Sequence, residues 1–88
     1  AYSHRLGDSE VVIMGTTELV KKYRRGFPNS LDGAPFLMQT NSNVLRRQMD
    51  QWFNGLHLVP HVRAEFDDSA MMKIAARQGL GLFPTPVC

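Results

Sequence analysis

Small hydrogen-bonding side chains gather at one point of the chain, in the run Gln39-Thr40-Asn41-Ser42-Asn43. An apolar stretch precedes this run and a helix-periodic pattern follows it, which places it between a strand and a helix start. Short polar side chains and free N–H groups at helix starts hold small ligands. We therefore predict that these five residues contact a small ligand. The alternative is that Asn41, Ser42 and Asn43 only cap the helix.

A second group of polar side chains is acidic and lies at 65, 67 and 68. Asp67 and Asp68, with Glu65 nearby, offer the oxygen atoms that hard cations such as sodium prefer. Under the alternative interpretation, one aspartate caps the next helix and the other favours its positive end. Phe83 and Pro84 come at the end of a later apolar run. We expect the ligand to lie in a cleft, with Asp67, Asp68, Phe83 and Pro84 on the side opposite to the run at 39–43.

Other kinds of chemistry lack their motifs. The histidines at 4, 57 and 61 have no zinc spacing, and the chain contains no GxSxG and no phosphate-binding GxxxxGK[ST]. We therefore predict no catalytic residues, no metal site and no cofactor. The alternative of a fragment of an α/β enzyme would require a nucleophile and base that the sequence does not display.

The strongest cluster of charge is KKYRR, residues 21–25. Its basic side chains alternate with Leu19, Val20, Tyr23 and Phe27 at helical spacing, which is typical of a solvated helix surface. The alternative is a weak nucleic-acid-binding module that contacts phosphates through these cations. A formal net charge of +2 does not favour that alternative.

Apolar runs alternate with helix-periodic segments along the whole chain. We expect strands near residues 10–14, 36–40, 61–66 and 80–84, with Pro84 ending the last, and helices near 17–26, 43–55 and 69–78. In the third helix, Met71, Ile74, Ala75 and Gln78 fall on one face. Strands joined through helices run parallel, so the pattern predicts a small, Rossmann-like, mainly parallel α/β sheet with helices on both faces.

Length and composition limit the organisation of the protein. The chain has 88 residues, 43% hydrophobic and 20% charged, which fits one globular domain. Its apolar runs are shorter than the roughly 18 residues of a membrane span, so no membrane partner is expected. Cys88 is the only cysteine, which favours the reducing cytoplasm.

Several longer motifs resemble one family. SLDGAPF, RRQMDQWF and ARQGLGLFP are similar to the effector-binding region of LysR-type transcriptional regulators. Taken together, YSHRLG, SLDGAPFLMQT, RRQMDQWF and EFDDSAMMK resemble most the branch that regulates sodium/proton antiporters. The resemblance covers almost the whole chain.

The resemblance implies a fold like the second lobe of a type II periplasmic binding protein. Residues 1–88 would then be one effector-binding subdomain, without the first lobe and the DNA-binding helix-turn-helix domain. It further implies a small effector or ion bound between two lobes, DNA and a second copy of the regulator as partners, and a role as an activator that responds to sodium or a small effector.

Overall fold

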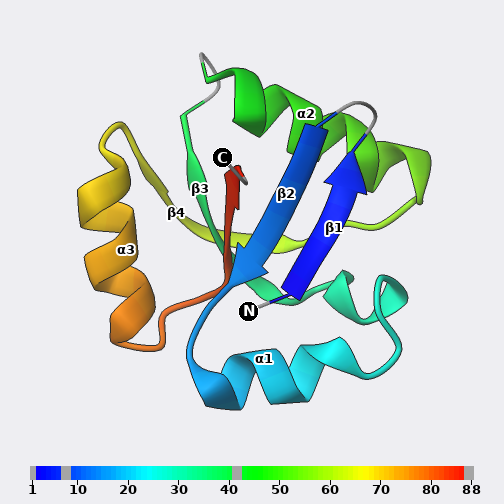
Figure 1. The fold of residues 1–88 in the computed structure, drawn as a ribbon, viewed down its shortest axis with the longest axis horizontal. Coiled ribbons are helices and arrows are strands. Elements are labelled where there is room, and N and C mark those ends of the chain that lie inside the picture. Colours follow the sequence, from blue (N-terminus) through cyan, green and yellow to red (C-terminus); the bar gives the residue numbers. More distant parts are fainter. Residues whose placement is uncertain (1, 7–8, 41–42, 87–88) are drawn as a thin grey trace.

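The structure, a computed structural model, describes residues 2–6, 9–40 and 43–86 and has a mixed α/β fold (Figure 1). Helices lie on both sides of the strands, as the sequence predicted. In chain order the elements are β1 (Tyr2–Leu6), β2 (Ser9–Met14), α1 (Thr17–Arg24), the 3-10 turn η1 (Asn29–Leu31), β3 (Pro35–Gln39), α2 (Val44–Gly55), β4 (His61–Phe66), α3 (Ser69–Arg77) and β5 (Phe83–Pro86).

The strands form a mixed arrangement rather than a wholly parallel one. β3 pairs with β4 in parallel, whereas β1, β2 and β5 pair antiparallel in the order β1-β2-β5. The two groups meet at Leu82, which bridges in parallel to Phe36. The expectation that β2 would pair in parallel was wrong. A helical crossover makes two strands parallel when they are neighbours in one sheet, and β2 and β3 are not hydrogen-bonded to each other.

The ends of the chain also differ from the expected pattern. β1 was not predicted, because its sequence YSHRL lacks apolar alternation, yet it pairs with β2 from Tyr2↔Ile13 to Leu6↔Ser9. The last strand was expected to stop at Pro84, but β5 continues to Pro86. β5 lies at the edge of the β1-β2-β5 sheet, where a proline, which lacks an N–H donor, is tolerated.

β3 separates two apolar clusters. Phe36 and Met38 belong to a cluster that includes Met49 and Phe53 of α2. Leu37 points the other way, into a cluster with Met72 of α3. Successive side chains of a strand alternate between its faces, and these three residues of β3 are fully buried. The continuous apolar sequence of β3 therefore reflects helices packed on both faces.

The apolar periodicity of α2 predicted most of its packing. Met49 and Phe53 are buried, and Leu45 and Trp52 pack against the same cluster while remaining partly exposed. The Phe36 and Phe53 rings meet edge to face with centroids 5.5 Å apart. Leu56 continues the apolar spacing of this face in the sequence, but it is the C-cap residue and is exposed.

The buried face of α3 was predicted incorrectly. Met72, Ala75 and Ala76 are buried, whereas Met71 and Ile74 are exposed. The α3 sequence is apolar at overlapping positions, so two candidate faces shared Ala75, and periodicity alone did not separate them. The buried face, which carries the two alanines, packs with Leu37 of β3 and Phe83 of β5, and Ala64 and Phe66 of β4 join the same cluster.

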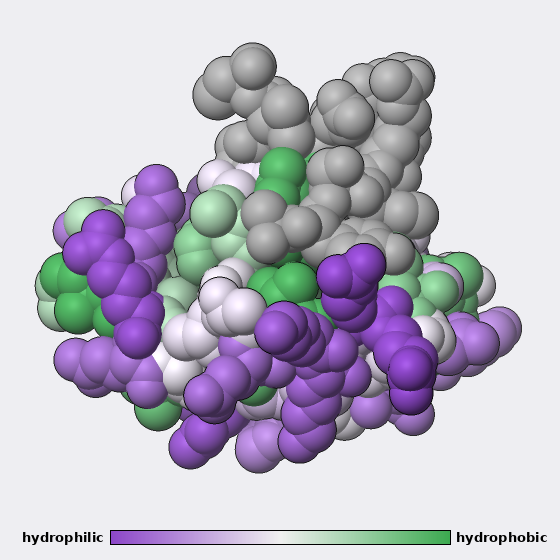
Figure 2. All heavy atoms as spheres, turned by 60° about the horizontal axis from the view of Figure 1, so that its bottom comes forward, coloured by the Kyte–Doolittle hydropathy of each residue, from purple (hydrophilic) through white to green (hydrophobic). Residues whose placement is uncertain are grey.

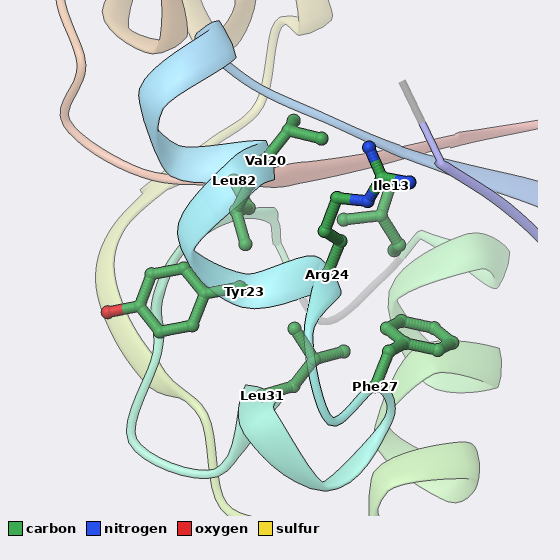
Figure 3. A pocket seen from close by; sticks show the side chains of 7 residues that line it. All are labelled: Ile13, Val20, Tyr23, Arg24, Phe27, Leu31 and Leu82. Carbon is green, nitrogen blue, oxygen red and sulfur yellow. The ribbon is translucent and has the colours of Figure 1, made fainter.

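α1 packs on the core through the side chains that Figure 3 shows beneath it. Val20, Tyr23 and Phe27 pack against buried residues that include Leu31 and Leu82, as the sequence predicted. The gap left beneath the helix is about 10 Å³. That volume is about the minimum for one water molecule, so this cavity is a packing gap and not a ligand site.

Candidate functional site

A cleft opens where β3 and β5 lie beside the starts of α2 and α3. We call it the α2–α3 cleft, and its volume is about 320 Å³, within the range of small-molecule sites. It is lined by Gln39, Asn43, Leu45, Ser69, Met72, Lys73, Pro84 and Thr85. Its polar side chains therefore come from four separate segments of the chain.

Two N-caps fix the helices that form the cleft. Asn43 has extended backbone angles, and its Oδ1 accepts from the N–H of Arg46 at 3.2 Å. Asp68 is likewise extended, and its Oδ1 accepts from the N–H of Ala70 at 2.9 Å. The capping roles considered for Asn43 and Asp68 are therefore present. Asn43 also lines the cleft, where its Nδ2 group is not used by the cap.

The structure brings together some of the residues predicted for the site. Gln39, Asn43 and Pro84 line the α2–α3 cleft, and Phe83 lines an adjoining cavity. Thr40 is partly buried and lies outside both linings, although its N–H donates to Phe66 O at 3.2 Å. Asp67 and Asp68 are exposed and line neither cavity. Asn41 and Ser42 lie outside the described residues.

Sequence reasoning did not single out Lys73, which reaches both the α2–α3 cleft and the adjoining cavity. Ser69 and Lys73 are separated by four positions at the start of α3, so they share a helix face. Had the buried face of α3 been assigned correctly, this spacing would have placed Lys73 beside Ser69 in the cleft.

Arg46 lies outside the lining of the cleft, but it contacts Gln39, which is part of that lining. Its Nη1 donates to the backbone oxygen of Gln39 at 2.8 Å and to Oε2 of Glu65 at 2.7 Å. Its Nε donates to both carboxylate oxygens of Asp50, each at 3.2 Å. One side chain therefore connects α2 to the ends of β3 and β4.

These contacts change the protonation equilibrium of Arg46. Burial acts to lower the pKa of its guanidinium, but the hydrogen bonds to Glu65 and Asp50, with their negative charge, outweigh it. The net result is a pKa raised above the usual arginine value. Arg46 is therefore a permanent cation, and the Glu65 carboxylate is already engaged by it.

Metal-binding groups are not assembled in the part of the chain that the structure describes. No three His, Cys, Asp or Glu side chains are grouped there as a metal site would require. Among the same residues, no helix is both long and apolar enough to cross a bilayer.

Comparison with protein families identifies the class of the protein. The LysR substrate-binding domain model matches residues 2–86. The chain therefore belongs to the LysR substrate-binding domain family, the effector-sensing region of LysR-type regulators, which is regulatory and not catalytic. No curated protein and no solved structure matches the chain.

Proposed function

We propose that this chain is the second lobe of the effector-binding region of a LysR-type transcriptional regulator, and that it binds a small effector in the α2–α3 cleft. One observation supports this proposal above the others. Polar groups of Gln39, Asn43, Ser69 and Thr85, each from a different segment, line one open hollow of about 320 Å³. A few convergent polar groups in a concave, partly apolar site are characteristic of ligand binding.

The proposed contacts follow from this geometry and from the family resemblance. Gln39, Thr40, Asn41 and Ser42 would donate or accept hydrogen bonds to the effector. The N-cap of α2 uses only the amide oxygen of Asn43, so the cap leaves its amide nitrogen to the effector, and the backbone N–H groups at the start of α2 complete the polar wall. In this proposal Pro84 belongs to the second wall of the cleft, and Phe83 lies in the adjoining cavity. Asp67 and Asp68 stand outside the lining, where they would face a first lobe that closes over the cleft.

A matched pair of cap substitutions tests the site. Serine caps helices about as well as asparagine or aspartate, so Asn43→Ser and Asp68→Ser each preserve a cap. In the regulator that carries this lobe, Asn43→Ser should raise the effector concentration for half-maximal induction about tenfold, because one hydrogen-bonding group is lost. Asp68→Ser is the control for a small-molecule effector, because Asp68 does not line the cleft. The response to sodium is tested separately below.

Two measurements separate binding from folding. Reporter induction measures the effector response, and a mobility-shift assay without effector measures operator binding, which should be equal in both variants. Substitution of Thr40 and Ser42 should likewise alter induction without abolishing operator binding. Equal induction curves for Asn43→Ser and Asp68→Ser would place the effector elsewhere.

The proposal extends to the regulator as a whole. The resemblance to antiporter regulators supports a cytoplasmic activator that forms homo-oligomers, binds DNA through a helix-turn-helix domain and responds to sodium or a small effector. Because Arg46 already engages Glu65, a sodium ion would need oxygen ligands from both lobes. The test is a titration of sodium against potassium at constant ionic strength, with Asp67→Asn and Asp68→Asn. Unchanged sodium induction in both variants would remove the acidic pair from the proposal.

A second candidate function rests on α1. Lys21, Lys22, Arg24 and Arg25 are all exposed and border one shallow hollow of about 680 Å³. Figure 2 turns this end of the molecule forward, and hydrophilic side chains dominate the face. Such a cluster would hold nucleic-acid phosphates, and binding would weaken steeply with salt. If the chain fails to bind generic duplex DNA at low salt, this alternative is excluded.

A further inference from the structure

A second cavity lies between the start of α1 and the C-terminal half of α3. We call it the α1–α3 cavity, and its volume is about 560 Å³, larger than the α2–α3 cleft. Met14, Gly15 and Thr16 line one side, and Arg77 and Phe83 line the other. The two hollows adjoin along Lys73 and Thr85, but Gln39, Asn43 and Ser69 line only the cleft.

The charge in the α1–α3 cavity is entirely positive among the residues described. Lys73 and Arg77 lie four positions apart on α3, on one helix face. Neither has a carboxylate within 4.0 Å in the described part of the chain, and no described Asp or Glu lines the cavity. Like charges at this spacing repel by roughly 0.2–0.5 kcal/mol, and an anion held between them would relieve the repulsion.

The rest of the lining indicates the kind of anion. Met14, Ala76 and Phe83 supply apolar surface, and Thr16, Thr17 and Thr85 supply hydroxyl groups. The Thr16 oxygen accepts from the N–H of Leu19 at 3.4 Å, so its own O–H can still donate. An arginine fork binds a carboxylate through two parallel hydrogen bonds, and an adjacent apolar wall accommodates a hydrocarbon chain.

We propose that the α1–α3 cavity binds a small organic acid, with its carboxylate between Lys73 and Arg77 and its hydrocarbon chain against Met14 and Phe83. The site is separate from the proposed effector cleft. Because Lys73 and Thr85 belong to both hollows, an acid bound here would also alter the wall of the cleft.

The test is a titration of the 88-residue chain followed by amide NMR, with butyrate as the probe and butyramide as its uncharged counterpart. We expect saturable shifts with butyrate at the Gly15, Thr17 and Phe83 amides, and at least about tenfold weaker binding of butyramide. Inorganic phosphate, the third arm, should bind more weakly than butyrate because it has no chain to place on the apolar wall. Stronger phosphate binding would replace the organic acid with a phosphate ligand.

Two substitutions then test whether Arg77 supplies the positive charge that binds the carboxylate. Arg77→Gln should weaken butyrate binding about tenfold, whereas Arg25→Gln, an exposed cation outside the cavity, should leave it unchanged. The comparison of butyrate with butyramide uses the unaltered chain, so a misfolded variant cannot obscure the result. Equal binding of the two probes, an equal effect of both substitutions, or shifts confined to Gln39 and Asn43 would each overturn the proposal.

Discussion

Replacing Arg46 with glutamine should destabilise the domain by about 1.5–5 kcal/mol. The hydrogen bond to Gln39 O comes from a charged donor whose side chain is only 11% exposed, and such a bond contributes about 1.5–3 kcal/mol. The carboxylates of Asp50 and Glu65 are 48% and 46% exposed, so solvent screens both ion pairs and each adds only about 0–1 kcal/mol.

The assay is urea unfolding followed by the fluorescence of Trp52, the only tryptophan, which packs beside Phe53 of the core. Arg47→Gln is the matched control, because Arg47 is exposed and such surface changes usually stay within about 0.5 kcal/mol. Adding Glu65→Gln to each background measures how much of the effect belongs to that pair. Equal unfolding free energies for Arg46→Gln and Arg47→Gln would refute the assignment of Arg46 as the connection between α2, β3 and β4.

The raised pKa of Arg46 also determines how the loss of unfolding free energy in Arg46→Gln should depend on pH. A base whose pKa is higher in the folded state than in the unfolded state stabilises the fold fully below the unfolded value. This contribution is lost only as the pH rises through the folded value, which is strongly alkaline for arginine. The destabilisation by Arg46→Gln should therefore be constant between about pH 6 and about pH 9. A steep fall within that window would show that another titrating group is responsible.

Three further predictions concern stability. Phe53→Ala should cost about 3–5 kcal/mol, and Trp52→Ala should cost less because Trp52 is only partly buried; circular dichroism would compare them, and the reverse order would contradict the packing. Gly79→Ala should cost about 1–2 kcal/mol in thermal unfolding, because Gly79 has φ +83° and alanine is strained there. Asp68→Ala should cost about 0.5–2 kcal/mol in urea unfolding while Asp68→Asn costs almost nothing, since only alanine removes the cap of α3; equal losses would argue against capping.

The sequence predicted the elements that depend on local patterns. The capping interpretations considered for Asn43 and for one of the two aspartates rest on chemistry within one helical turn, and Asn43 and Asp68 both cap their helices. The strand expected at residues 61–66 likewise coincides with β4, in which Val62, Ala64 and Phe66 alternate with more exposed residues. These elements follow from short-range geometry, which a single sequence contains.

Features that depend on distant partners were not predictable in the same way. The direction of β2 depends on its pairing with β5, which lies some seventy residues later and carries no signal of pairing. Arg46 and Asp50 form a visible i,i+4 pair, but the contact with Glu65 exists only because β4 lies beside β3. For the same reason the sequence could place Gln39 and Pro84 together at one edge, where strand ends meet and both line the α2–α3 cleft, but it did not point to Lys73. That these residues bind an effector stays a prediction.

The position of β3 between two cores restricts how its sequence can change. Every side chain from Phe36 to Met38 is enclosed, so no position in this stretch faces water and accepts a polar replacement. A change of volume at Phe36 or Met38 must be matched from α2, whereas one at Leu37 must be matched from α3. A single inserted residue would reverse the alternation, so the side chains of β3 that now face α2 would face α3, and those that now face α3 would face α2. Related sequences should therefore vary here in two separate groups of positions, one shared with each helix, and should keep the length of this strand constant.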